Sequence, residues 1–243
     1  MRIERDVDEI SSAREKDLSE KSFSLVSLQD VTLGYGSTRV VGNVNLAIYS
    51  GSLIGLAGPN GSGKTTLFRT ILGLLPPLSG TLSRGCPLSR FGYVPQSAAL
   101  DPQFPLSAAE VVEMGAYGRV RPYQLFSAAE RERVKEVLQQ IGLPQLGARP
   151  FFSLSGGQKQ RMLIARALMV NPKIMILDEP LSGVDEESRR SIAELLTKLT
   201  RENDLAVFFS SHDLEMVQRV ADSIVQIDQG QIWLDERKAR LRP

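Results

Sequence analysis

The hydrophobic positions of this chain follow two periods, and their order along the sequence predicts an α/β fold. From about residue 23, the segments FSLVSLQDVTLGYG and VVGNVNLAIYSG alternate apolar and polar residues and break at glycines, which is typical of antiparallel strands. Shorter, wholly apolar runs follow at SLIGLAG, KIMILD and LAVFF. Because segments of helical period separate these runs, we expect a parallel sheet covered by helices on both faces.

Helical spacing recurs in four segments of this α/β pattern. They are TTLFRTILGLL, a stretch over 157–170 that stops before Asn171-Pro172, a helix with Ile192, Leu195, Leu196 and Leu199 on one face, and a helix over 213–221. The last periodic segment, SIVQIDQGQIWL, predicts a hairpin that turns at Gln229-Gly230.

Residues 97–150 have a different texture, rich in Pro, Ala and short helical stretches. In SAAERERVKEVLQQIG, Ser127 and Glu130 predict a capping box, and Gly142 predicts the end of the helix. We therefore expect an α-helical subdomain, over about 97–170, inserted into the larger α/β unit.

Composition and charge narrow the function classes. The chain has 243 residues with 29 Lys+Arg and 28 Asp+Glu, so its net charge of +1 offers no basic field for nucleic acid. A single cysteine and a single histidine exclude an internal disulfide and a multi-histidine metal site. No apolar run approaches the roughly 18–20 residues that span a bilayer. The charged residues 1–22 lack the apolar core of a signal peptide and predict a mobile extension or a partner-binding arm, and 236–243 predict a short tail.

The strongest chemical motif is a G-x-x-x-x-G-K-[ST] phosphate loop between a predicted strand and a predicted helix. Its glycines let successive backbone N–H groups turn toward phosphate oxygens, and the helix adds the positive end of its dipole. Lys64 would reach the β- and γ-phosphates, and the Thr65 hydroxyl would bind Mg²⁺. The candidate nucleotide-binding residues here are Gly58, Pro59, Asn60, Gly61, Ser62, Gly63, Lys64, Thr65 and Thr66.

Two acids follow the apolar strand IMIL, at the edge where open α/β sheets bind ligands. Successive residues of a strand point to opposite sides, so Asp178 and Glu179 are expected to have different tasks. Asp178 suits the Mg²⁺ shell, and Glu179 suits polarising an attacking water. A turn or a helix cap is the alternative for such a pair, and the phosphate loop upstream favours the catalytic interpretation.

A second candidate anion site lies at Leu154-Ser155-Gly156-Gly157-Gln158, directly before a predicted helix. A serine and two glycines at a helix N-terminus can bind an anion. From these residues alone, a simple helix cap is the favoured alternative.

Together these motifs resemble the ATP-binding cassette (ABC) family of transport ATPases over about residues 23–235. LSGGQ is that family's signature, and it stands between the phosphate loop and ILDEP, as in the family. The resemblance implies a P-loop NTPase (RecA-like) core with an antiparallel β subdomain and the inserted helical subdomain. It also implies a dimer that holds two ATP molecules, in which Ser155 and Gly157 bind the γ-phosphate of the other subunit's ATP, with Gly156 and Gln158 in the same nucleotide-binding motif.

Other positions match the family residue by residue. Tyr35 resembles the aromatic residue that stacks on adenine, and Gln96 resembles the Q-loop glutamine that contacts Mg²⁺. Asp185, in SGVD, resembles the D-loop acid that meets the partner subunit, although SALD is commoner there. His212 resembles the switch histidine near the γ-phosphate. The resemblance thus implies Glu179, His212, Lys64 and Gln96 as catalytic residues, and Thr65, Gln96 and Asp178 as ligands of Mg²⁺.

The family resemblance further implies ATP hydrolysis that drives two transmembrane permease subunits, with the chain at the cytoplasmic face of the inner membrane. The segment DPQFPLSAAEVVEMGAYGR is similar to the manganese, zinc and iron importer ATPases, so we expect import of a divalent metal with an extracytoplasmic solute-binding protein. An iron-chelate or other solute transporter is the alternative.

Two further classes are disfavoured. A soluble ABC ATPase of ribosomes or DNA would carry two cassettes or a long coiled coil, and neither pattern is found here. A non-catalytic regulatory subunit disagrees with the intact Lys64, Asp178, Glu179 and His212.

Overall fold

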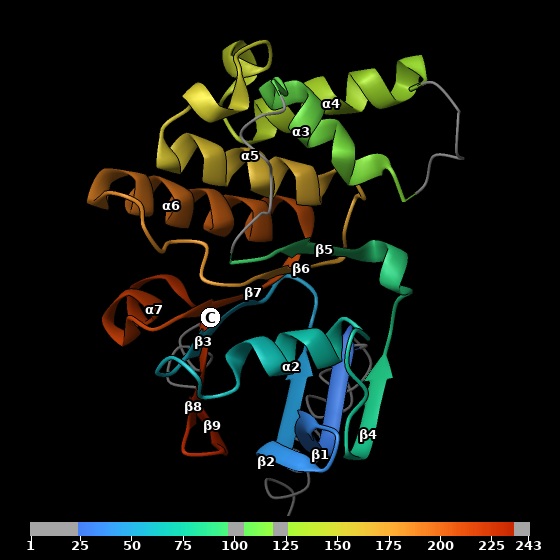
Figure 1. The fold of residues 1–243 in the computed structure, drawn as a ribbon, viewed down its shortest axis with the longest axis vertical. Coiled ribbons are helices and arrows are strands. Elements are labelled where there is room, and N and C mark those ends of the chain that lie inside the picture. Colours follow the sequence, from blue (N-terminus) through green and yellow to red (C-terminus); the bar gives the residue numbers. More distant parts are fainter. Residues whose placement is uncertain (1–23, 97–104, 119–125, 236–243) are drawn as a thin grey trace, which may run out of the picture.

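The structure is a computed structural model that describes residues 24–96, 105–118 and 126–235 (Figure 1). The expected extension at 1–22, the tail at 236–243 and the first residues of the expected helical insertion lie outside these ranges.

Two sheets form the framework. The antiparallel sheet has the order β2-β1-β4, with β1 Val26–Tyr35, β2 Thr38–Ile48 and β4 Ser79–Arg84. The larger sheet has the order β5-β6-β7-β3-β8-β9, with β5 Phe91–Val94, β6 Ile174–Leu177, β7 Ala206–Ser211, β3 Leu53–Ala57, β8 Ser223–Asp228 and β9 Gln231–Asp235. Neighbouring strands from β5 to β8 are parallel, and β9 returns antiparallel to β8. The predicted parallel sheet is confirmed.

The helices are α2 Lys64–Ile71, α3 Ala108–Glu113, α4 Ala128–Gln140, α5 Gly156–Leu168, α6 Glu186–Asn203 and α7 Leu214–Val220. Short 3-10 turns lie at η1 Leu88–Arg90, η2 Met114–Ala116, η3 Pro144–Leu146 and η4 Phe151–Ser153. Within the described ranges, none of these helices has both the length and the apolar composition needed to cross a bilayer.

Strand alternation divides the interior into two cores on opposite faces of the large sheet. Ile176 and Phe208 pack with α2 and the antiparallel sheet, whereas their neighbours Leu177 and Phe209 pack with the α3–α6 layer. Figure 1 shows the same division, with α2 between the two sheets and α3, α4, α5 and α6 on the other side. The sheet is therefore covered on both faces, as its wholly apolar strands predict.

Several local predictions are confirmed. Ser127 and Glu130 form a capping box on α4, and Gly142 follows that helix with φ of 73°. Gln229 and Gly230, with φ of 46° and 73°, make the turn between β8 and β9. Positive φ at both central residues is the type I′ geometry that matches the twist of paired strands.

Other elements differ from the sequence pattern. The helix expected over TTLFRTILGLL ends at Ile71, because the chain turns at Gly73 with φ of 73°. Strands β4 and β5 are not predicted by the alternation, and α3 carries a second capping box between Ser107 and Glu110 that the sequence analysis missed.

One guanidinium fastens the helical layer together. Arg161 of α5 donates to the carbonyl oxygen of Ile141, at the end of α4, over 3.1 Å. The same side chain donates to the backbone and the hydroxyl of Ser191 in α6. Three helices are thus joined by a single side chain.

Candidate nucleotide-binding site

The phosphate loop connects the buried strand β3 to helix α2, and glycine is required at two of its positions. Gly63 precedes α2 with φ of 109°, and a Cβ there would overlap a methyl group of Val41. A Cβ on Gly58 would overlap the carbonyl oxygen of Ile227 in β8. The curled backbone therefore depends on residues without a side chain at both ends of the loop.

The N-terminus of α2 has no side-chain cap, because its N-cap residue is Gly63. Within the loop, the Ser62 hydroxyl is buried without a hydrogen-bond partner among the described residues. A helix start with unsatisfied N–H groups carries partial positive charge, and a buried polar atom without a partner is costly. Both features fit a phosphate group in the loop.

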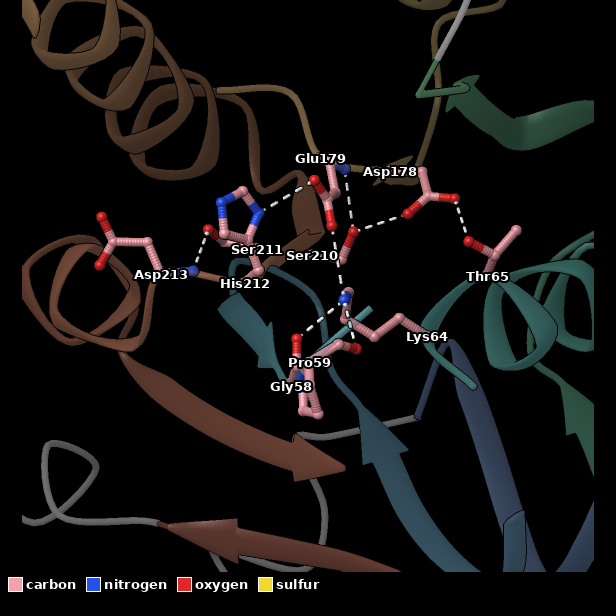
Figure 2. Close-up of polar contacts among 10 residues, drawn as sticks. All are labelled: Gly58, Pro59, Lys64, Thr65, Asp178, Glu179, Ser210, Ser211, His212 and Asp213. Atoms are coloured by element: carbon pink, nitrogen blue, oxygen red, sulfur yellow. Dashed lines mark hydrogen bonds and ion pairs between the residues drawn. The ribbon is translucent and has the colours of Figure 1, made fainter. Parts of the chain in front are cut away.

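Lys64 lies over the loop and points toward the acids (Figure 2). Its Nζ donates to the carbonyl oxygens of Gly58, over 2.8 Å, and Pro59, over 3.1 Å, and lies 3.4 Å from Oε1 of Glu179. The side chains of Lys64 and Glu179 are each 6% exposed, so this ion pair is screened little by solvent.

Asp178 is held on both of its carboxylate oxygens. The Thr65 hydroxyl donates to Oδ2 over 2.7 Å, and the Ser210 hydroxyl donates to Oδ1 over 2.7 Å. A hydroxyl and a carboxylate beside a phosphate loop are the hard oxygen donors that Mg²⁺ prefers, and Mg²⁺ usually completes its shell with phosphate and water. Thr65 and Asp178 therefore fit the ion.

Glu179 is turned away from Asp178 by its backbone, which has φ of 49° in the left-handed region. Its Oε2 lies 3.1 Å from Nδ1 of His212, while its other oxygen faces Lys64. The His212 side chain is 54% exposed, in contrast to the buried glutamate. The two acids have different partners, as expected (Figure 2). The cause is the left-handed backbone of Glu179, beyond the end of β6, rather than the alternation of a continuous strand.

A cavity of about 330 Å³ is lined by Tyr35, Gln96 and most of the predicted phosphate-loop residues. Its lining is Tyr35, Val40, Asn60, Gly61, Gly63, Lys64, Thr65, Thr66, Gln96 and Glu179. The Tyr35 hydroxyl lies 3.4 Å from that of Thr66, at the end of β1. Glu179 also lines a smaller cavity beside it, of about 150 Å³, together with His212. The aromatic residue, the phosphate loop and Gln96 thus meet in one place.

The LSGGQ residues do not line this cavity. Ser155 and Gln158 form a capping box at the start of α5, in which Ser155 Oγ accepts from the Gln158 N–H over 3.3 Å and Gln158 Oε1 accepts from the Ser155 N–H over 3.1 Å. Gly157 packs so closely on α6 that a Cβ would overlap the Ser188 hydroxyl, and Gly156 lies near Val184. In the single chain Ser155 therefore caps α5, which is the helix-cap alternative that the sequence offered.

Asp185 caps α6 in the same region. Its two carboxylate oxygens accept from the N–H and the hydroxyl of Ser188, each over 2.8 Å. These hydrogen bonds, the backbone one first, hold the pKa of the Asp185 carboxyl below its usual range. Asp185 therefore has a role within its own chain.

Ser210 is a site residue that the sequence analysis missed. It is fully buried at the end of β7, and its hydroxyl contacts both acids. In the sequence it is the first polar residue after the apolar run LAVFF, with Ser211 beside it in the same strand, and this position alone does not distinguish it from an ordinary strand end.

A phosphate loop between a parallel strand, β3, and a helix, with two acids at the end of β6, which is separated from β3 by β7 in the same sheet, defines a P-loop ATPase. The sequence profile of the ABC transporter family matches residues 41–182, and the chain belongs to that family. It is an ATP-binding, ATP-hydrolysing subunit of an ABC transporter.

Curated relatives and solved structures agree with this assignment. The manganese transport system ATP-binding protein MntB of Bacillus subtilis (strain 168) is 40% identical over 82% of this chain and 82% of its own. The zinc import ATP-binding protein ZnuC of Pseudomonas fluorescens (strain Pf0-1) is 37% identical over 84% of this chain and 74% of its own.

Two solved structures share the fold. One is an inward-facing conformation of a putative metal-chelate type ABC transporter, with a TM-score of 0.82 and 27% identity over 90% of this chain and 86% of that one. The other is a dimeric ATP-binding cassette in a post-hydrolysis state bound to ADP and Pi, with a TM-score of 0.72 and 31% identity over 86% of this chain and 97% of that one.

Proposed function

We propose that this chain hydrolyses Mg²⁺-ATP to drive the import of manganese or zinc through a pair of permease subunits. The hydrolytic part rests on one observation, the continuous contact of Lys64, Glu179 and His212 beside the phosphate loop. The choice of cargo rests on the two curated relatives, whose names specify manganese transport and zinc import.

Phosphoryl transfer requires positioning and charge stabilisation more than covalent chemistry. Thr65, Asp178 and Gln96 would hold Mg²⁺, which supplies positive charge next to the phosphates. Lys64 exchanges its contacts with the loop carbonyls for the β- and γ-phosphate oxygens. Tyr35 stacks on adenine at the mouth of the cavity. Loop residues 58–66 enclose the phosphates with their N–H groups.

Glu179 orients the attacking water and receives its proton, because its carboxylate lies between Lys64 and His212. The exposed His212 contacts the γ-phosphate and can move without disturbing the core. Its partner oxygen on Glu179 keeps the imidazole close to the reaction centre.

A second copy of the chain completes the site. Ser155, Gly156, Gly157 and Gln158 would face the γ-phosphate held by the partner, and Asp185 would lie at the same interface. The dimeric cassette bound to ADP and Pi supports this arrangement by similarity. A functional unit is then two of these chains, two permease subunits and a solute-binding protein outside the membrane, with the chains at the cytoplasmic face.

Metal uptake in a strain that lacks this gene tests the proposal. The wild-type chain should restore uptake of radioactive manganese or zinc, and a Glu179→Gln chain expressed at the same level should not. Normal metal uptake in the deletion strain, with uptake of another solute lost, would contradict the choice of cargo. Absence of Mg²⁺-dependent phosphate release by the wild-type chain, alone and with its permease, would contradict the hydrolytic part.

A metal chelate is the second candidate cargo, favoured by the metal-chelate type transporter with its TM-score of 0.82. The same deletion strain distinguishes the two. Loss of ferric-chelate uptake with normal manganese and zinc uptake supports the chelate.

A further inference from the structure

The hydroxyl of Ser210 joins the two acids of the site. It donates its proton to Oδ1 of Asp178 over 2.7 Å, and it accepts the backbone N–H of Glu179 over 2.9 Å. Figure 2 shows Ser210 between the acids, with one dashed line to each. A serine hydroxyl has one proton to donate and two lone pairs, so both contacts can form at once.

The strand register places this hydroxyl. Leu177, the last residue of β6, pairs with Phe209 of β7, so Ser210 stands one residue beyond that pair. Alternation along β7 puts Ser210 on the same face as Phe208, which packs with α2 and the phosphate loop's side of the sheet. Ser210 is completely buried, and its hydroxyl contacts Asp178 and Glu179, the two residues that directly follow β6.

The two hydrogen bonds of Ser210 restrict different groups: one fixes the Asp178 carboxylate and the other fixes the Glu179 backbone. Asp178 has the Thr65 hydroxyl on one carboxylate oxygen, and the Ser210 hydroxyl fixes the other oxygen, so the carboxylate plane is defined. Glu179 has a left-handed backbone with φ of 49°, a conformation that costs energy for a residue with a side chain. The contact of its N–H with Ser210 stabilises that turn.

We propose that Ser210 is a positioning residue for ATP hydrolysis. Through Asp178 it orients the oxygen that faces the Mg²⁺ site, and through the Glu179 backbone it sets the general base between Lys64 and His212. The inference rests on the proposed hydrolytic function and adds a residue that touches neither the nucleotide nor the attacking water.

Three variants of the full chain test this role. Ser210→Ala removes both hydrogen bonds, Ser210→Thr keeps the hydroxyl, and Ser210→Cys keeps a similar shape with a much weaker donor. Thr200→Val is the matched control, because it removes a buried hydroxyl from α6, where Thr200 donates only to its own helix at Leu196. Thermal melts show which variants are folded.

The readouts separate positioning from packing. The affinity for a fluorescent ATP analogue is measured with Mg²⁺ and with EDTA, and phosphate release gives kcat and KM. For Ser210→Ala we expect kcat to fall at least tenfold, the Mg²⁺-dependent gain in affinity to fall at least threefold, and the affinity in EDTA to stay within twofold. Ser210→Cys should follow alanine, and Ser210→Thr and Thr200→Val should stay close to wild type in both readouts.

Two outcomes overturn the inference. One is a folded Ser210→Ala or Ser210→Cys chain with kcat and Mg²⁺ dependence within twofold of wild type. The other is a Ser210→Ala chain whose only change is a lower melting temperature, with Ser210→Thr no closer to wild type in kcat than Ser210→Cys. Failure of the hydrolytic function itself looks different, because the wild-type chain would then release no phosphate whatever residue stands at position 210.

Discussion

The chain has two glycine-rich helix N-termini, and their caps differ. Helix α2 begins after Gly63, which has no side chain to offer, whereas α5 begins after Ser155, which forms a complete capping box with Gln158. The first end lies beside a buried lysine and the buried Ser62 hydroxyl, which has no partner in the part of the chain that the structure describes. At the second end Ser155 and Gly156 are exposed, and the capping box satisfies the N–H groups of Ser155 and Gln158.

The α2 end has no side-chain cap until a ligand binds, whereas the α5 end is capped without one. An uncapped helix end next to buried charge gains most when a phosphate arrives. A capped end must give up an internal hydrogen bond, or share it, when it meets an anion. We therefore expect α2 to decide nucleotide affinity in the single chain, and α5 to act only when two chains meet.

The largest effect is expected from Glu179→Gln. Turnover should fall at least about 100-fold, because an amide cannot accept a proton from water, and general-base catalysis contributes roughly 10²–10⁴-fold. ATP binding should persist, since the loop and Lys64 are unchanged, and ATP should hold two chains together. Phosphate release and size-exclusion chromatography with ATP measure both effects. Glu132→Gln, at an exposed ion pair on α4, is the control. Near-normal turnover would refute the role of Glu179.

Lys64→Ala tests the α2 end directly. Affinity for Mg²⁺-ATP in the single chain should fall at least about tenfold, because the buried site loses the cation that would face the phosphates. Equilibrium binding of a labelled nucleotide checks this, with Lys198→Ala on the surface of α6 as the control. Unchanged affinity would mean that the uncapped helix and loop amides suffice without the lysine.

Ser155→Ala tests the α5 end with a smaller expected effect. Nucleotide affinity of the single chain should stay within about twofold, while turnover at dimer-forming concentrations should fall roughly tenfold. Loss of the cap should also lower the free energy of unfolding by about 0.5–2 kcal/mol. Ser127→Ala is closely matched, since it removes the same type of capping box from α4. If the two variants lose stability and turnover equally, the LSGGQ serine is only a cap.

The smallest effect is expected from Asp185→Asn, and it depends on pH. Hydrogen bonds from Ser188 lower the pKa of this carboxyl below its ordinary value of 3.8 in the folded chain. A group with a lowered folded pKa stabilises the fold above its unfolded pKa and loses that contribution as pH falls through the folded pKa. The melting temperature of the variant should therefore lie slightly below that of wild type at pH 7, and the gap should narrow below about pH 4. A gap that is independent of pH would assign the effect to capping geometry alone.

The sequence predicted those parts of the site that lie within one motif. The phosphate loop, the two acids and His212 were identified from residues next to each other in the chain, and the wholly apolar strands predicted the two-faced sheet. The contacts among motifs were not predictable, because they follow from β6 and β7 being neighbours in a strand order that skips through the sequence. Ser210 acts through that adjacency, so local patterning gives it no signal.

The elements that were missed have a common physical reason. Strand β4 alternates poorly and is largely exposed, and it joins the antiparallel sheet through its pairing with β1. Strand β5 has four residues, too few for a period to appear. The overlong helix prediction at TTLFRTILGLL failed at Gly73, where a left-handed residue ends the helix although apolar residues continue.

Because Arg161 links α4, α5 and α6, a spectroscopic probe on one of these helices would report the movement of the helical layer. Because α4 is tied to the helices that carry LSGGQ and Asp185, a probe on its exposed face reports where those residues travel. Cys86, the single cysteine of the sequence, lies between β4 and η1, on the other side of the large sheet, and offers the second attachment point. Burial raises the pKa of its thiol, so labelling there calls for a mildly alkaline buffer. One introduced cysteine on α4 then gives a molecular ruler between the two layers.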